Sequence, residues 1–350
     1  MRPRTISVLV LSAVALASVS GFARRPEPDW RLTDPGVTAR LRGLAAVSDR
    51  VAWASGSDST VLRTVDGGRS WQRVGPADPG LELRDIEAFD ADSAVVLSIG
   101  TGGDSRVYRT DDAGRNWTET FRNDDERAFY DCLAFFDRRH GLALSDPVDG
   151  RFRILSTADG GRSWSVLPGT GMPAALEGEF AFAASGTCLV TADRGPDRAW
   201  FATGGGASAR VFRTDDRGRS WSVTASPVPS GPSAGIYSLA FRDAGHGIAV
   251  GGDYTTPASA PDGAATSRDG GRSWTVAAGP PGAYRSGAAW LPRAGWLALA
   301  VGPTGSDISY DGGRRWRNFD AGSFDSVDCT AGGACWASGE QGRIATLRWR

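Results

Sequence analysis

The chain has 350 residues and a formal net charge of −1, with arginine as its only strongly basic residue type, no lysine and two histidines. A charge so close to zero gives no electrostatic reason to expect nucleic acid or an anionic membrane as a partner. The absence of lysine excludes Schiff-base chemistry, attachment of pyridoxal phosphate and a P-loop lysine, and we predict no cofactor.

Residues 1–23 have the composition of a secretory signal peptide. Arg2 and Arg4 make its start positive, residues 6–19 are apolar and uncharged, and residues 20–23 offer small side chains for cleavage. No later apolar run is long enough to span a bilayer. We therefore expect a bacterial protein exported to the periplasm or beyond, whose mature part, residues 24–350, is a single domain.

The pattern Ser/Thr-x-Asp-x-Gly-x-x-Trp, which we call the box turn, occurs six times. Its aspartates are Asp66, Asp112, Asp159, Asp216, Asp269 and Asp311, and its tryptophans are Trp71, Trp117, Trp164, Trp221, Trp274 and Trp316. Successive tryptophans lie 42 to 57 residues apart, which is the period of a four-stranded propeller blade. Glycine suits a tight hairpin, the Asp and Ser/Thr oxygens can bond to the backbone, and the tryptophan can pack between blades. We therefore interpret the repeated aspartates as structural.

The box turns divide the chain into blades, and the two ends supply one more. The expected blades are 40–74, 84–120, 128–167, 178–224, 236–277 and 285–319, with insertions near 192–198 and 254–261. Residues 324–349 supply three strands without a box turn, and residues 29–33 resemble the strand that follows one. We therefore expect an all-β, seven-bladed propeller of four-stranded antiparallel blades, in which the N-terminal segment is the outer strand of the last blade.

The cysteines and histidines follow the same repeat. Cys329 and Cys335 flank a tight turn, which predicts a cross-strand disulfide in an exported protein. A bridge between Cys132 and Cys188 requires that two inner strands lie close together, and the sequence leaves it open. The cysteine spacing does not fit a zinc site, and no metal site is predicted. His140 and His246 share one repeat position, in the turn between the first and second strands of a blade, at the end opposite the usual ligand-binding surface.

We expect a ligand-binding surface where two kinds of loop meet. One kind joins the fourth strand of a blade to the first strand of the next blade, and the other joins the second and third strands of one blade. The candidate rim residues are Arg127, Tyr130, Asp131, Asp146, Asp149, Arg151, Glu179, Asp253, Tyr254 and Arg285. Two interpretations stay open: a small polar or peptide-binding pocket at the channel, or a solvated rim, because polar loops cap every propeller. No catalytic residue is assigned.

The box turns resemble the Asp-box, or BNR, repeat of sialidases and related propellers, and the match covers nearly all the mature chain. Because that repeat occurs in enzymes and in non-enzymes, it does not indicate which function the chain has. Together with the seven blades, the export signal and the stretches 143–150 and 181–188, the repeat makes the chain similar to the photosystem II stability/assembly factor-like group and its bacterial relatives. The resemblance implies a monomeric, non-enzymatic scaffold that binds a protein partner in the cell envelope, with a small ligand or glycan as a further option.

Two enzymatic alternatives are weaker. A sialidase-type glycoside hydrolase needs an arginine cluster for the substrate carboxylate, a tyrosine activated by glutamate and an acidic proton donor. The segment Phe-Arg-Ile-Leu at 152–155 is similar to a sialidase signature, but it lacks the proline and precedes the third box turn instead of the first. An oxidoreductase of unknown substrate, a label that some bacterial relatives carry, has no dinucleotide fingerprint or Cys-x-x-Cys to support it.

Overall fold

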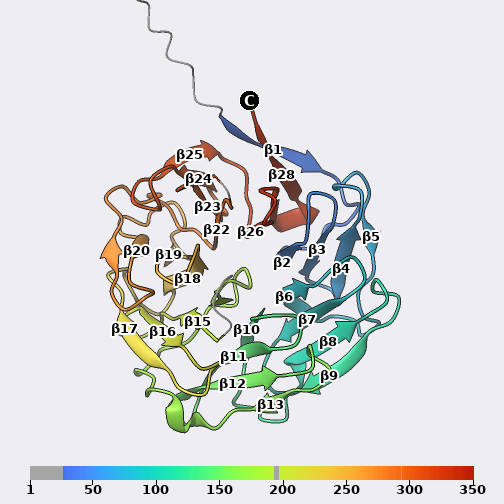
Figure 1. The fold of residues 1–350 in the computed structure, drawn as a ribbon, viewed down its shortest axis with the longest axis horizontal. Helices are drawn as coiled ribbons and strands as arrows, with labels where there is room; N and C mark the ends of the chain where they lie inside the picture. Colours follow the sequence, from blue (N-terminus) through green and yellow to red (C-terminus); the bar gives the residue numbers. More distant parts are fainter. Residues whose placement is uncertain (1–26, 193–196, 293) are drawn as a thin grey trace, which may run out of the picture.

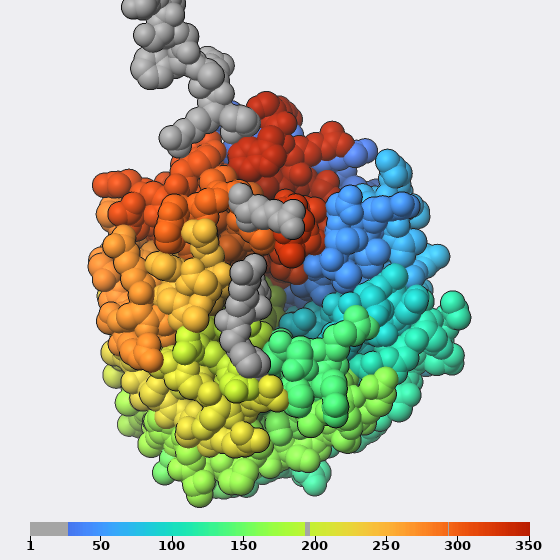
Figure 2. Space-filling view, viewed as in Figure 1, coloured from blue at the N-terminus to red at the C-terminus, as the bar shows by residue number. Residues whose placement is uncertain are grey.

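The computed structural model describes residues 27–192, 197–292 and 294–350, so the predicted signal segment, residues 1–23, lies outside the described residues. The described residues form seven four-stranded antiparallel sheets arranged as blades around a central axis (Figure 1). In the space-filling view the blades follow one another in chain order around a disc (Figure 2). The predicted seven-bladed, all-β propeller is confirmed. In these ranges no helix is both long and apolar enough to cross a bilayer.

Each blade runs from an inner strand at the axis to an outer strand at the rim. The inner strands are β2 (Leu41–Ala46), β6 (Glu82–Ala88), β10 (Tyr130–Phe135), β14 (Leu189–Thr191), β18 (Ala234–Phe241), β22 (Gly287–Trp290) and β26 (Ser326–Cys329). The second strands are β3 (Ala52–Gly56), β7 (Ala94–Ile99), β11 (Gly141–Val148), β15 (Ala199–Ala202), β19 (Gly247–Asp253), β23 (Ala298–Gly302) and β27 (Cys335–Ser338). The third strands are β4 (Thr60–Thr64), β8 (Arg106–Thr110), β12 (Arg151–Thr157), β16 (Arg210–Thr214), β20 (Ala264–Ser267), β24 (Gly305–Ser309) and β28 (Ile344–Trp349). The outer strands are β5 (Gln72–Arg73), β9 (Thr118–Arg122), β13 (Ser165–Val166), β17 (Ser222–Ala225), β21 (Thr275–Val276), β25 (Arg317–Asp320) and β1 (Pro28–Thr33).

The two ends of the chain close the ring. Strand β1 pairs antiparallel with β28, in a register that runs from Pro28 opposite Trp349 to Thr33 opposite Ile344. Trp30 is buried, its ring lies 5.4 Å from that of Phe324, and its indole N–H donates to Ser306 Oγ in the neighbouring blade at 2.9 Å. The predicted seventh blade, with the N-terminal segment as its outer strand, is confirmed.

Each box turn is a self-contained hydrogen-bond unit. In the first, the Thr64 hydroxyl accepts the Gly68 N–H at 3.0 Å, and Asp66 accepts the N–H and the hydroxyl of Ser70 at 3.0 and 2.7 Å. The side-chain hydrogen bond from Ser70, followed by its backbone N–H, lowers the pKa of Asp66 to about 2. In all six turns the glycine N–H donates the same hydrogen bond to the Ser/Thr hydroxyl oxygen, which accounts for the repeated residue types.

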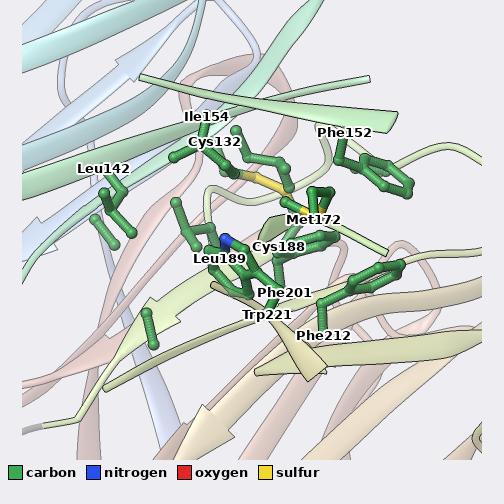
Figure 3. Close-up of a cluster of buried hydrophobic side chains, with 14 residues drawn as sticks. Cys132, Leu142, Phe152, Ile154, Met172, Cys188, Leu189, Phe201, Phe212 and Trp221 are labelled. Carbon is green, nitrogen blue, oxygen red and sulfur yellow. A yellow bond between two sulfur atoms is a disulfide. The ribbon is translucent and has the colours of Figure 1, made fainter. Parts of the chain in front are cut away.

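The box tryptophans join neighbouring blades, as predicted. Each one packs into a hydrophobic cluster that includes the second strand of the preceding blade. Trp71, for example, meets Trp336 edge to face with ring centroids 5.9 Å apart. In Figure 3 the corresponding cluster between the third and fourth blades holds Trp221, Leu142 and a disulfide.

Both disulfides are formed. Cys329 is bonded to Cys335 across the turn between β26 and β27, which confirms the predicted pair. Cys132 on β10 is bonded to Cys188, which directly precedes β14, with their Cα atoms 6.1 Å apart. The pairing that the sequence leaves open therefore links two adjacent blades at the axis (Figure 3).

The inner strands are free sheet edges, and side chains satisfy part of their backbone. A side-chain oxygen on one inner strand accepts an N–H of the next inner strand in three places: Asp85 from Leu133 at 2.7 Å, Asp328 from Ala46 at 2.8 Å, and Ser238 from Ala288 at 2.9 Å. Because a buried N–H without a partner is costly, these bonds stabilise the contact between blades at the axis.

We predict that the closure depends on the buried Trp30. The Trp30→Ala variant should lower the free energy of unfolding by about 3–5 kcal/mol, because it leaves a cavity beside Phe324. Trp349→Ala, on the paired strand but 43% exposed, is the matched control and should cost less than about 1 kcal/mol. Denaturant unfolding measures both, and equal losses for the two variants would contradict the assigned closure.

Candidate functional site

Bulges in four inner strands mark the site. The register between the first two strands of a blade shifts between Leu41 and Gly43, Leu83 and Asp85, Tyr130 and Cys132, and Ile236 and Ser238. The residues that carry the bulges are Arg42, Arg84, Asp131 and Tyr237, all at one repeat position. A bulge bends a strand and re-aims a side chain. These residues lie where the inner strands begin, which we call the loop end; the opposite end, with the box turns, we call the box end.

Arg42 is an incompletely satisfied charge at the loop end. Its side chain is 19% exposed, and within the described residues its guanidinium donates no hydrogen bond, while Nε lies 3.9 Å from Asp325 Oδ1. Burial first, and then the positive charges of Arg84 and Arg40, lower the pKa of Arg42 to about 10. A buried guanidinium beside two other arginines favours an anionic ligand, because an anion would supply the missing hydrogen bonds.

The two flanking arginines have partners. Arg40 forms a bidentate pair with Asp325, with Nε to Oδ2 at 2.8 Å and Nη2 to Oδ1 at 2.7 Å, and it lies 3.2 Å from Glu340. Arg84 lies 3.3 Å from Glu82 and donates to the Ala183 carbonyl at 2.8 Å. These contacts hold the side chains of Arg40 and Arg84 at the channel, where both positive charges act on Arg42.

Carboxylates occupy the adjacent part of the channel. Burial raises the pKa of Asp146 to about 7, although its carboxylate accepts the Ala181 N–H at 2.8 Å. Burial, and next the charge of Asp146, raise the pKa of Asp131 well above its usual range. Asp85, also buried, has its pKa raised to about 7, with the hydrogen bond from Leu133 as the opposing effect. The channel therefore has an arginine side and a carboxyl side.

A segment of the chain, residues 180–187, crosses the channel, and we call it the plug (Figure 1). It precedes β14 and bonds to five other blades: Ala181 to Asp146, Ala183 to Arg84, Thr187 to Ser238, and Ser185 to both Ser286 and Ser326. Gly186 has φ +79°, and a side chain there would collide with the Asp85 carboxylate. The plug therefore fills the channel at the loop end and forms a floor there, and charged side chains surround this floor.

Aromatic rings border this floor on one side. Phe182 of the plug stacks on Tyr237 with centroids 3.8 Å apart, and Tyr237 meets Tyr284 edge to face at 4.7 Å. Tyr254 is 56% exposed, and its ring lies 6.5 Å from that of Tyr237. The loop end thus combines an unsatisfied cation with an aromatic border.

The structure brings together only some of the predicted rim residues. Asp131 and Asp146 lie at the channel, and Tyr254 lies at the aromatic border, beside Asp253, which accepts the N–H and hydroxyl of Thr255. Arg127 and Asp149 pair with each other at 2.7 Å on the exposed surface of the third blade. Arg151 donates to the Met172 carbonyl.

Three predicted rim residues lie inside the blades and do not form the rim. Tyr130 is fully buried with its ring 5.4 Å from Phe121, and burial raises its pKa to about 12. Glu179 and Arg285 are neutralised by Arg210 and Asp307, respectively, in buried pairs. A buried charge needs such a partner, and these two residues have theirs within their own blades.

Arg40, Arg42 and Arg84 are not among the rim residues predicted from the sequence. Alignment of the inner strands to the cysteine repeat would have found two of them, because Arg42 and Arg84 occupy the position just before that of Cys132 and Cys188. Within the described residues no three His, Cys, Asp or Glu side chains are grouped in a way that could hold a metal ion.

Comparisons with known proteins give the fold. No protein-family model and no curated protein matches the chain. A solved structure described as "YCF48 bound to D1 peptide" superposes with a TM-score of 0.65 at 14% identity, covering 92% of this chain and 96% of that one. YCF48 from Cyanidioschyzon merolae gives 0.62 at 15% identity, with 91% and 98% covered. The GH74 xyloglucanase from Xanthomonas campestris gives 0.61 at 15% identity, with 92% of this chain and 55% of that one covered. The chain is thus a seven-bladed propeller similar in fold to YCF48.

We predict that the buried carboxyls make the protein less stable at neutral pH than at mildly acidic pH. A carboxyl with a raised pKa in the folded state binds its proton more tightly there than in the unfolded chain, so stability falls as pH rises from about 4 to about 7. Asp85→Asn cannot ionise, and its amide oxygen can still accept the Leu133 N–H. The variant should therefore reduce the fall by up to about 1.4 kcal/mol per pH unit.

Urea unfolding at pH 5, 6, 7 and 8 measures this slope. Asp149→Asn, at an exposed position, is the control and should follow the wild type. A wild-type stability that rises from pH 5 to pH 8, or an Asp85→Asn slope equal to that of the wild type, would contradict the assignment.

Proposed function

We propose that this protein is an exported, non-enzymatic scaffold that binds an acidic, extended segment of a cell-envelope protein at its loop end. The observation that carries the proposal is Arg42: a largely buried guanidinium without a hydrogen bond among the described residues, beside Arg40 and Arg84. A carboxylate of the partner would accept hydrogen bonds from it and offset the repulsion among the three arginines.

The aromatic border supports an extended peptide over a free inorganic anion. Tyr254 is exposed next to the buried Tyr237 and Tyr284, so the arginines and an apolar surface lie at the same end of the channel. A segment with an acidic residue and nearby apolar residues can contact both. The polar plug gives such a segment a floor and prevents it from entering the channel.

The comparison with YCF48 is a second support. That propeller has been solved with a D1 peptide bound, so a chain with this fold can bind a segment of another protein. Together with the resemblance to the photosystem II stability/assembly factor-like group, this favours an assembly role in the cell envelope. The signal-like residues 1–23 are the basis for placing the protein in the periplasm or outside the cell.

The hydrolase alternative has one specific feature to test. Arg40, Arg42 and Tyr284 lie close together, which is part of what a sialidase-type site requires. However, burial raises the pKa of Tyr284 above its usual value, and the charged groups that act on its pKa are arginines and Asp325 with no glutamate among them. An activated phenol needs the opposite effect, so we favour binding.

Fluorescence anisotropy with two labelled nonapeptides tests the proposal, one with three glutamates and one with three glutamines in their place. The acidic peptide should bind more tightly, and Arg42→Gln should weaken its binding about 10-fold or more, since a charge-assisted hydrogen bond contributes about 1.5–3 kcal/mol. Arg115→Gln, at an exposed position of the second box turn, is the matched control and should bind like the wild type.

Two results would overturn this function. Equal binding of both peptides, or an Arg42→Gln variant that binds the acidic peptide like the wild type, would remove the anionic site. Hydrolysis of a fluorogenic sialoside by the wild type, abolished by Tyr284→Phe, would replace the scaffold with the hydrolase.

A further inference from the structure

A pocket of about 380 Å³ lies at the box end between the fifth and sixth blades, far from the groups that form the loop-end site. Its walls come from the turn between β18 and β19, the turn between β22 and β23, and the two adjacent box turns. The side chains that matter for its chemistry are His246, Arg268, Trp290, Trp296, Tyr310 and Arg314.

Trp296 is the feature that the repeat does not explain. It is not a box tryptophan, and it lies 46% exposed on the turn between β22 and β23. The connection between β22 and β23 spans seven positions, 291–297, as does the connection 192–198 of the fourth blade, whereas the connections 47–51, 89–93, 136–140, 242–246 and 330–334 span five. The Trp296 carbonyl accepts the Gly312 N–H of the sixth box turn at 2.9 Å, which fixes the backbone at Trp296. This hydrogen bond holds Trp296 at the wall of the pocket.

The fifth blade has no tryptophan at a position where three other blades have one. The second position of the second strand holds Trp53, Trp200 and Trp336 in the first, fourth and seventh blades, where each indole bonds to the backbone of the next blade. In the fifth blade this position is Ile248, which is buried in the same hydrophobic cluster as Trp290 and Trp316 of the sixth blade.

The charged groups that line the pocket are two arginines, Arg268 and Arg314, and one carboxylate, Asp311. Arg268 is exposed and makes no hydrogen bond or ion pair with the described residues. The His246 ring is held by Asp243, at 2.9 Å from Nδ1, and its Nε2 bonds to none of the described side chains. The nearby Asp311 carboxylate is already occupied by the Ser309 hydroxyl and the Arg315 N–H. The local charge is therefore complementary to an anion.

The ring geometry narrows the class of ligand. Trp296 meets His246 at 76° and Trp290 at 66°, so no two parallel rings are available to sandwich a flat aromatic ligand. The guanidinium of Arg242 already lies 4.4 Å from the Trp296 ring centre, and with Arg268 it disfavours a cationic ligand. A single indole face beside several hydrogen-bond donors suits a pyranose, whose C–H groups pack on the indole while its hydroxyls and carboxylate bond to the donors.

We propose that this pocket binds an acidic sugar, with Trp296 under the sugar ring and Arg268 on its carboxylate. The site is separate from the loop-end peptide site and does not rest on the proposed function. It would let the propeller bind a uronic acid at one end and a protein at the other.

Isothermal titration of the full mature protein with glucuronate tests this, with glucose and benzoate as the neutral-sugar and flat-anion probes. Glucuronate should bind with a millimolar or tighter dissociation constant and more tightly than either probe. Trp296→Ala should weaken glucuronate binding at least tenfold, and Arg268→Gln should reduce it to the level of glucose. Trp349→Ala and Arg42→Gln should leave it unchanged, which separates this site from the loop end.

No heat with glucuronate, benzoate binding as tight as glucuronate binding, or full affinity in both Trp296→Ala and Arg268→Gln would overturn the proposal. Both changed side chains are exposed, and an unchanged thermal midpoint verifies that the variants are folded. Trigalacturonate distinguishes two sources of the same chemistry: tighter binding than the monosaccharide indicates the end of a polymer, and equal binding indicates a free sugar.

Discussion

The antiparallel pairing of β1 with β28 is the contact on which the rest of the molecule depends. Every blade packs its two faces on its neighbours, so an open ring would expose two large apolar faces. The pairing places Trp30 against Phe324 and bonds it to the sixth blade through Ser306. The candidate site is built across the same closure, because Arg40 of the first blade forms its ion pair with Asp325 of the last. Closure and site geometry are therefore physically linked.

The loop end departs from the regular pattern of the blades in ways that favour binding. At the box end, repeated Ser/Thr and Asp side chains satisfy the turns locally and lower the pKa of Asp66 and its equivalents. At the loop end, bulges turn Arg42 and Arg84 toward the axis, and the plug brings its polar backbone among them. The loop end contains a buried polar group without a hydrogen-bond partner and carboxyls with raised pKa values. Such groups are typical of places where a ligand supplies the missing hydrogen bonds. The structure is most regular where it provides stability and least regular where it is proposed to bind.

The sequence was sufficient for the fold and insufficient for the site. The box turns and the position of Trp30 predict seven blades and their closure because those features are local and repeated. The bulge at Arg42 is a matter of register between β2 and β3, which no local pattern reveals, and one arginine among so many carries little information. Loop-adjacent residues were placed on the rim, but Glu179 points into its blade because Arg210 neutralises it there. The plug depends on hydrogen bonds to five blades, all of them distant in the sequence.

Hydrogen–deuterium exchange of the full mature protein, with and without the acidic nonapeptide, tests most directly whether the loop end receives a partner. We expect slower exchange at residues 40–44, 82–86 and 180–187 when the peptide is present, because these segments carry the three arginines and the plug. Protection confined to the box turns, or no protection in the presence of saturating peptide, would contradict this expectation.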